Sequence, residues 1–260
     1  MKKSLVGVSA LVLGAVLAFT GCGASESRES ATEESASETL VTLIESASEA
    51  TTTTEETVVQ EDCVVIDGAE YHEGDILTFG SFGEGPISWV IIDIDGDNVM
   101  LLSEYIIENK MFNEELTDTS WEECTSRAWL NGEFVDSAFT DEEKALILDT
   151  NVPNTPNPEF DTQSGNATVD KVFLLSADEF EELVPEEYRA SLVTDYAWKQ
   201  NVARSNPDGF GEWFLRTPGT SARMAVYVTT GGNAYTPGCD VSFPGRGLRP
   251  AMWITASSVG

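Results

Sequence analysis

The chain has 260 residues, of which 45 are acidic and 14 are basic, so its net charge at pH 7 is −31. Residues 63–260 alone carry 34 acidic and 11 basic side chains. A surface this negative excludes nucleic acid and anionic lipid head groups as partners, because like charges repel. Cations, neutral sugars and basic proteins are compatible with it, and so is an acidic surface that serves solubility alone.

The N-terminus has the pattern of a secretory signal. Lys2 and Lys3 precede an apolar run over residues 5–19, which is shorter than the roughly 20 residues that span a membrane. The run ends at Gly21-Cys22, and small residues before a cysteine resemble the lipobox of bacterial lipoproteins. The resemblance implies a lipoprotein signal peptide over residues 1–21 and lipidation at Cys22. It also implies a lipid anchor on the extracellular face of the bacterial cell membrane. The alternative is an ordinary signal peptide with a chance cysteine.

The segment that follows, residues 22–62, is rich in Ser, Thr and Glu. Residues 23–62 contain 11 acidic side chains and one basic one. Such a segment buries too little apolar surface to offset the entropy lost on ordering, and its like charges keep it extended. We therefore expect a disordered acidic tether, followed by one folded domain over residues 63–260.

The first part of this domain reads as strands. Asp95-Gly96 separates the apolar runs 91–94 and 99–102, and an Asp-Gly pair between β-rich runs predicts a tight hairpin. The same acidic segment, Asp93 to Asp97, is an alternative calcium loop. It lacks the Glu at loop position 12 of an EF-hand, and strands rather than helices flank it, so the turn is favoured.

Helices are predicted next, because three capping boxes occur. Their residue pairs are Ser120 with Glu123, Thr140 with Glu143, and Ser176 with Glu179. Residues 151–170 are rich in Pro, Asn and Gly and should form a loop, whereas the apolar run 171–175 predicts a buried strand. Short strands are expected at the end, over residues 213–216, 224–229, 241–243 and 250–254. Strands, then helices, then strands indicate an α+β fold.

Several motifs resemble a bacterial family, a domain of unknown function numbered 6273, over about residues 70–257. They are Pro86-Ile87-Ser88-Trp89-Val90-Ile91, Trp121-x4-Ser126-Arg127-x-Trp129-Leu130-Asn131, Phe134, Phe139, Asp170-Lys171-Val172-Phe173-Leu174-Leu175-Ser176, Glu179, Trp213-Phe214-Leu215-Arg216-Thr217-Pro218-Gly219 and Leu248-Arg249-Pro250-Ala251-Met252-Trp253-Ile254. The family name implies no activity.

The C-terminal plan also resembles C-type-lectin-like folds, including the formylglycine-generating enzymes. A strand with Trp213 and Arg216 is followed by a Gly-rich region and a strand with Arg249 and Trp253. The resemblance implies a C-type-lectin-like single domain with an N-terminal strand hairpin, three short helices and C-terminal short strands. In such folds the two terminal arms pair, and long loops on one side bind ligands.

Enzyme signatures are weak. The one histidine, His72, stands in a turn-like context, and no His and Cys residues cluster at metal-ligand spacing. The formylglycine-generating enzymes use two active-site cysteines near the C-terminus, where this chain has Cys239 alone. We therefore predict no enzymatic activity and no cofactor, although the many carboxylates leave a glycoside hydrolase as a less favoured alternative. Pairing among Cys63, Cys124 and Cys239 is left open.

Calcium is the metal that the acidic composition would suit best. The loop with Asp161, Asn166 and Asp170 offers hard oxygen ligands, and many lectin-like folds bind this ion. Asn166 and Asp170 are equally suited to capping the loop before the apolar run at Phe173. We favour this capping role over a calcium site.

A ligand-binding region is predicted between residues 223 and 243, where polar and aromatic side chains alternate with glycines. The candidate residues are Arg223, Tyr227, Asn233, Tyr235 and Asp240. Tyrosine gives contact area at low entropic cost, and asparagine gives adaptable hydrogen bonds, although an ordinary hairpin also carries surface tyrosines. We expect a surface-displayed binding module for a carbohydrate, cell-wall or protein ligand. The alternative is a structural, envelope-organising lipoprotein without a small ligand.

Overall fold

The structure is a computed structural model that describes residues 63–205 and 207–256. The predicted signal peptide, Cys22 and the acidic tether lie outside the described residues. None of the described helices is long and apolar enough to span a membrane. The architecture is α+β with mostly antiparallel strands, as the order of predicted elements indicated.

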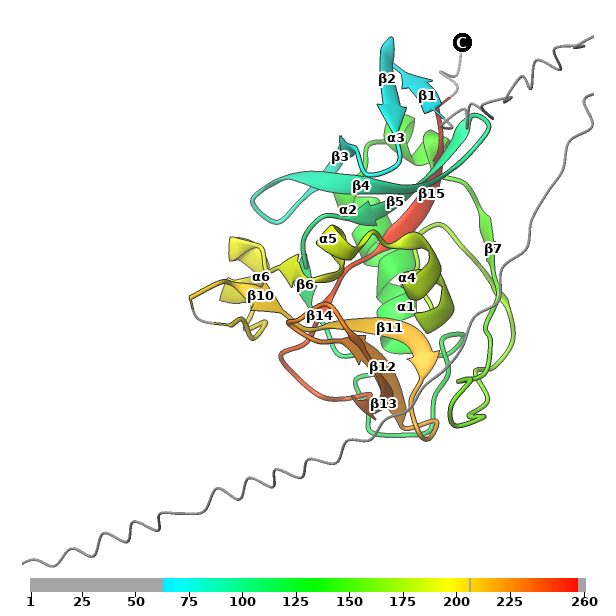
Figure 1. The fold of residues 1–260 in the computed structure, drawn as a ribbon, viewed down its shortest axis with the longest axis vertical. Coiled ribbons are helices and arrows are strands. Elements are labelled where there is room, and N and C mark those ends of the chain that lie inside the picture. Colours follow the sequence, from blue (N-terminus) through cyan, green and yellow to red (C-terminus); the bar gives the residue numbers. More distant parts are fainter. Residues whose placement is uncertain (1–62, 206, 257–260) are drawn as a thin grey trace, which may run out of the picture. The chain divides into compact units, whose positions relative to one another are not determined.

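A small hairpin of β1 (Cys63–Ile66) and β2 (Ala69–His72) opens the described chain. Its turn residues Asp67 and Gly68 have φ values of 50° and 81°, the positive φ that two-residue hairpin turns require. Val64 packs into the core, so one face of the hairpin is buried and the other faces solvent. The hairpin is cyan at the top of Figure 1.

A four-stranded antiparallel sheet follows, in the order β15-β5-β4-β3. Its strands are β3 (Ile76–Phe82), β4 (Gly85–Asp95), β5 (Asn98–Ser103) and β15 (Ala251–Thr255). Asp95 pairs with Asn98 across Gly96 and Asp97, which confirms the predicted hairpin. The C-terminal strand β15 pairs with β5 over its whole length, so the last described strand completes a sheet that is otherwise formed by residues 76–103.

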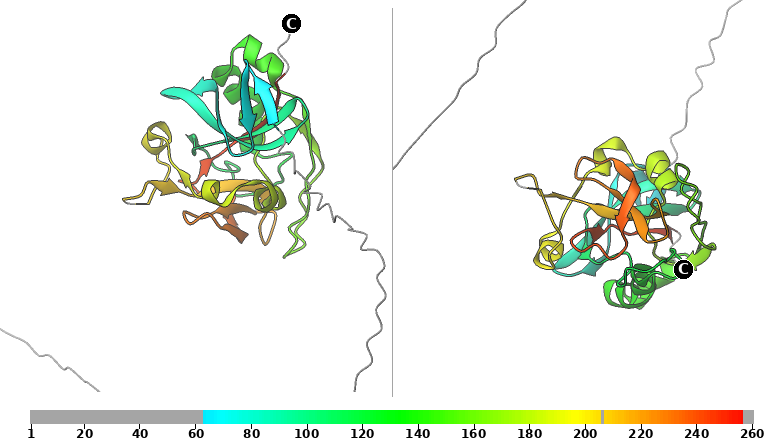
Figure 2. Two further views of the ribbon diagram at one scale, coloured as in Figure 1. Left: turned by 45° about the horizontal axis from the view of Figure 1, so that its top comes forward. Right: turned by 90° about the horizontal axis from the view of Figure 1, so that it is seen from below.

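The second sheet has five strands in the order β13-β12-β11-β14-β6. They are β6 (Glu108–Asn109), β11 (Trp213–Pro218), β12 (Met224–Val228), β13 (Ala234–Asp240) and β14 (Gly247–Leu248). Only the β11–β14 pair is parallel among these. In Figure 1 and in the left view of Figure 2 the two sheets lie apart, and the red C-terminal segment runs from β14 to β15 between them.

Two short ladders complete the described strands. They are β7 (Thr150–Val152) with β8 (Thr168–Asp170), and β9 (Ser191–Leu192) with β10 (Phe210–Gly211). The predicted loop 151–170 is therefore the long connection of a β7–β8 hairpin, with strand residues at both ends. The predicted strand 171–175 is buried over residues 172–175, but only Phe173 forms a bridge, to Ala251.

Helices are more numerous and shorter than the three predicted. The described residues hold α1 (Thr125–Trp129), the π-helix η1 (Leu130–Phe134), α2 (Val135–Ala138), α3 (Asp141–Leu146), α4 (Ala177–Leu183), α5 (Glu186–Arg189) and α6 (Asp195–Lys199). The capping boxes at Thr140 and Ser176 are confirmed. The box at Ser120 is wrong, since α1 begins only at Thr125. The strand expected at 241–243 is also wrong: the N–H of Phe243 donates to the Asp240 carbonyl in a turn after β13.

An aromatic cluster fixes α6 beside the β3–β4 hairpin. The ring of Phe82, at the end of β3, meets those of Trp129, Phe134 and Tyr196 edge-on, with centroids 5.8, 5.2 and 5.4 Å away. A Cβ on Gly83 would lie 2.5 Å from the Tyr196 ring, and φ at Gly83 is +63°. Glycine is required here for both reasons.

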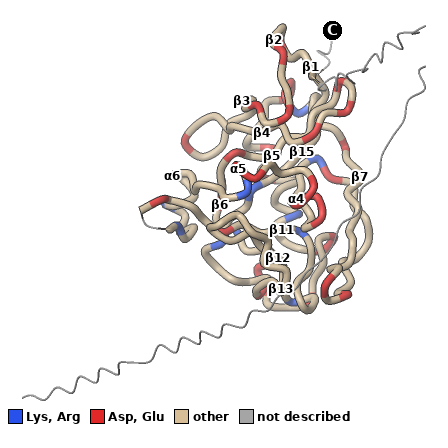
Figure 3. Tube along the Cα trace, viewed as in Figure 1, with Lys and Arg blue, Asp and Glu red and all other residues tan. Residues whose placement is uncertain are grey.

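Three of the basic side chains, Arg216, Arg246 and Arg249, are buried. Arg249 is 0% exposed, donates to the carbonyls of Ser103 and Tyr188, and has its pKa lowered to about 9 by burial. Because these charges lie inside, the exposed surface is more acidic than the net charge alone indicates. In Figure 3 the acidic positions are distributed along most of the described chain.

Candidate ligand-binding sites

The predicted recognition residues lie along one β-hairpin. Arg223 precedes β12 and Asp240 ends β13, where it pairs with Met224. Tyr227 and Tyr235 pair across the middle, with ring centroids 5.3 Å apart. Asn233 is in the turn at the other end. The structure therefore brings the two tyrosines together but separates Asn233 from Arg223 and Asp240 by the length of the strands.

Much of the polar capacity of this hairpin is used within the protein. The Asn233 amide donates to the Gly231 carbonyl, and Arg223 donates to the Leu116 carbonyl. Tyr227 is half-buried, and burial raises its pKa. Tyr235, in contrast, is 46% exposed. Tyr227 therefore contributes to the packing of the hairpin as well as to its surface.

Sequence reasoning missed the side chain that organises this face, Arg246. Its guanidinium lies 3.7 Å from the Tyr227 ring centroid and 4.4 Å from that of Phe243, and it pairs with Glu212 at 2.9 Å. Arg246 also donates to the Cys239 thiol at 3.1 Å. Burial raises the pKa of Cys239 to about 11, so this thiol stays protonated at neutral pH. No local pattern marked Arg246, because it follows a turn outside the ladder.

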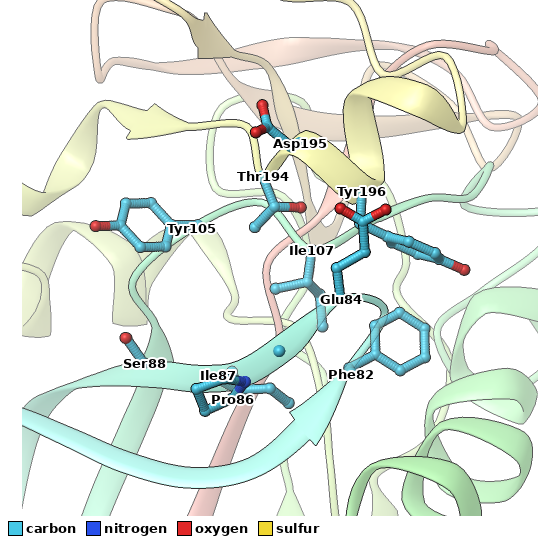
Figure 4. A pocket seen from close by; sticks show the side chains of 11 residues that line it. Phe82, Glu84, Pro86, Ile87, Ser88, Tyr105, Ile107, Thr194, Asp195 and Tyr196 are labelled. Carbon is cyan, nitrogen blue, oxygen red and sulfur yellow. The ribbon is translucent and has the colours of Figure 1, made fainter.

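A concave site lies elsewhere, between the start of β4 and α6. It is a pocket of about 280 Å³. Three segments that are far apart in the sequence line it: Phe82, Glu84, Gly85, Pro86, Ile87 and Ser88 from the β3–β4 hairpin, Tyr105 and Ile107 after β5, and Thr194, Asp195 and Tyr196 at the start of α6. Figure 4 shows Tyr105 on one side, Phe82 and Tyr196 on the other, and Ile107 between them.

The pocket combines an apolar floor with polar edges. Ile87 and Ile107 are buried, and Tyr105 is half-buried. At the rim, Glu84 pairs with Lys199 at 2.7 Å and Asp195 lies 3.7 Å from Arg204. Ion pairing holds both rim carboxylates in place, and their remaining lone pairs can accept hydrogen bonds from a ligand.

Both tyrosines of the pocket are neutral at physiological pH, and each hydroxyl already donates its proton to a glutamate of the protein. Burial raises the pKa of Tyr105, as does its hydrogen bond with Glu104. The pKa of Tyr196 is raised by burial and by Glu108, which hydrogen-bonds its side chain. Burial likewise raises the pKa of Glu108, and the like charge of Glu133 adds to this. The pocket therefore offers aromatic rings, phenol oxygens and carboxylate acceptors around an apolar floor, which suits binding of a polyhydroxylated molecule.

Two of the residues considered for calcium, Asn166 and Asp170, have hydrogen-bond partners within the protein. The Asp170 carboxylate accepts hydrogen bonds from Trp121 Nε1 at 2.9 Å and Arg127 Nε at 2.7 Å, and from the Thr168 hydroxyl. The Asn166 amide donates to Glu122. Asp170 thus ties the end of the loop to Trp121 and to Arg127 of α1, whereas the backbone N–H groups of Lys171 and Val172 donate to Asn131 Oδ1.

One group of potential metal ligands does form in the described part of the chain. Cys63, Glu70 and His72 have ligand atoms that all lie within 4.8 Å of one another on the β1–β2 hairpin. The sequence contains no His and Cys residues at a common metal-ligand spacing, yet the fold brings these three side chains together. The hairpin turn brings together residues whose separation in the sequence matches no common metal motif.

A family model described as a domain of unknown function (DUF6273) matches residues 96–256. The chain belongs to the DUF6273 family. This confirms the family resemblance, although the match begins at the β4–β5 turn rather than near residue 70. No curated protein and no solved structure matches the chain. The β1–β2 hairpin and the Glu84–Ser88 edge of the pocket precede the segment that matches DUF6273.

Proposed function

We propose that this DUF6273 protein is a surface-displayed lipoprotein whose domain binds an uncharged or cationic carbohydrate of the cell envelope. The observation that carries the proposal is the pocket between β4 and α6, with its apolar floor, two neutral tyrosines and two rim carboxylates. Sugars present apolar C–H faces and hydroxyl edges, and these match aromatic rings and carboxylate acceptors.

The negative charge of the domain restricts which carbohydrates it can bind. Residues 63–260 have a net charge of −23, and the pocket rim adds Glu84 and Asp195 locally. Phosphate-rich or uronic polymers would be repelled by this field. A neutral glycan or an amino sugar would not be, and the carboxylates would accept its hydroxyl or ammonium protons.

A C-type-lectin-like arrangement is part of the same proposal. It is supported by the pairing of the C-terminal strand β15 with β5 and by the buried Trp213, Arg216 and Arg249 of the terminal segments. In such an arrangement the ligand site belongs to loops and hairpins outside the paired arms. Both the pocket and the β12–β13 hairpin satisfy this condition.

Tyr105→Ala is expected to weaken glycan binding at least about fivefold, since loss of an aromatic contact or of a hydrogen bond accepted by the phenol oxygen costs roughly 1–3 kcal/mol. Binding is measured on an array of glycans and peptidoglycan fragments, followed by titration calorimetry with the best ligand. Tyr235→Ala, an exposed aromatic on the other candidate face, is the matched control and should bind as wild type.

The two variants distinguish three results. Loss of binding in Tyr235→Ala with retention in Tyr105→Ala would place the ligand on the β12–β13 hairpin and refute the pocket. A folded wild-type protein that binds no glycan in the array would refute the glycan-binding proposal and favour a structural lipoprotein. A carbohydrate that is cleaved rather than held, with cleavage lost in Glu108→Gln, would favour the hydrolase alternative.

Cys22→Ala is expected to abolish incorporation of a palmitate analogue, because the proposed lipid attaches to the Cys22 sulfur. Metabolic labelling in the producing cell, with detection on the purified protein, measures this. Cys239→Ser is the control, since it removes another cysteine and should leave the label unchanged. A label that persists in Cys22→Ala contradicts the lipid anchor.

A further inference from the structure

The solvent face of the β1–β2 hairpin carries three side chains that favour transition metals. Cys63 and His72 are direct cross-strand partners, and Glu70 pairs with Val65 in the same ladder. Successive side chains alternate between the faces of a strand, so Cys63, His72 and Glu70 share one face. Val64 and Tyr71 occupy the other face, and Val64 is buried. The pairing register of β1 and β2 therefore places these three side chains next to one another.

The spacing of the ligand atoms fits a tetrahedral ion. All three lie within 4.8 Å of one another. Zinc bonds of about 2.0–2.3 Å place tetrahedral ligand atoms roughly 3.3–3.8 Å apart. An approach of about an ångström is within reach of side-chain rotation on a solvent-facing hairpin.

A carboxylate lies near each ring nitrogen of His72. Its Nε2 lies 3.7 Å from Glu70 Oε1, and its Nδ1 lies 3.7 Å from Asp75 Oδ2. The Asp75 carboxylate is itself fixed, because it accepts the backbone N–H of His72 at 2.8 Å. Metal-binding histidines commonly have a carboxylate beside the far ring nitrogen, and Asp75 is placed to take this role when the ion binds.

We propose that this face binds one Zn²⁺ through the Cys63 thiolate, His72 Nε2 and a Glu70 carboxylate oxygen, with water in the fourth position. Thiolate and imidazole favour zinc over calcium and magnesium, which prefer oxygen ligands alone. The ion would join the two ends of the hairpin. The site lies outside the segment that matches the family and does not depend on the glycan pocket.

The test uses the full-length protein without a histidine tag, stripped with a chelator and titrated with Zn²⁺ or with Co²⁺ as a spectroscopic probe. We expect one equivalent to bind, with a thiolate-to-cobalt charge-transfer band and the visible bands of tetrahedral cobalt. Cys63→Ser and His72→Ala should each weaken binding at least about tenfold. Asp75→Asn should weaken it about 10–100-fold, as loss of an outer carboxylate does.

Cys239→Ser is the matched control. Burial raises the thiol pKa to about 11 at Cys239 and at Cys124, so neither should provide a thiolate, and the control should bind metal as wild type. Zn²⁺ should also slow alkylation of Cys63, read by peptide mass spectrometry, but not that of Cys239. Cobalt bound without a thiolate band, or Cys63→Ser binding as tightly as wild type, would overturn the proposal. Circular dichroism of each variant shows that the fold is intact.

Discussion

Trp213→Ala is expected to lower the free energy of unfolding by about 3–5 kcal/mol, the range typical of buried aromatic side chains truncated to alanine. The ring is 0% exposed and meets Phe180 edge-on at 5.6 Å. The Arg249 guanidinium lies 5.0 Å from its centroid on another side. Truncation would leave a buried cavity at the start of β11 and remove the ring that the Arg249 guanidinium contacts.

Urea unfolding measures the loss as a shift of the midpoint at constant slope. The melting temperature should fall by roughly 6–20 °C for a domain of this size. Trp213→Phe is the matched control: it keeps most of the volume, and Trp213 Nε1 has no hydrogen-bond partner among the described residues. It should lose less than half as much. An unchanged midpoint in Trp213→Ala would contradict the placement of this strand in the core.

Local turn and capping chemistry was predictable where the interacting residues are neighbours in the sequence. Asp95-Gly96 gave the β4–β5 hairpin, and Thr140 and Ser176 begin helices as expected. Ser120 does not, because the Trp121 indole is held by Asp170, 49 residues away. The first helical N–H, on Thr125, instead donates to the Asn113 side chain. A residue far away in the sequence therefore determines where this helix begins, and a local capping pattern contains no information about that residue.

The candidate sites also differ in whether local sequence or distant contacts determine them. The strand that carries Tyr227 was predicted at 224–229, whereas the strand that carries Tyr235 was not, and the pocket requires three segments whose contact depends on the whole fold. The Cys63–His72 pair is an intermediate case. Asp67-Gly68 is the same hairpin signal as Asp95-Gly96, and its recognition would have placed these two residues opposite each other.

The buried ion pair between Arg216 and Glu179 carries the second large expected effect. Arg216 is 3% exposed, and both its terminal nitrogens donate to the Glu179 carboxylate. The same carboxylate accepts the N–H of Ser176 in the capping box of α4. Glu179→Ala should therefore cost about 3–5 kcal/mol, because it leaves a buried cation without its counterion and also removes a cap.

Glu179→Gln separates the two contributions. The amide oxygen can still accept the Ser176 N–H, as Gln does in a capping box, so the remaining loss reports the missing charge. The double variant Arg216→Met/Glu179→Gln removes the stranded cation as well, and apolar replacement of a buried pair is often close to neutral. It should therefore be more stable in urea than Glu179→Ala. If the losses from Arg216→Met and Glu179→Gln instead add without coupling in the double variant, the two side chains do not act as a pair, and the stability of this junction comes from packing alone.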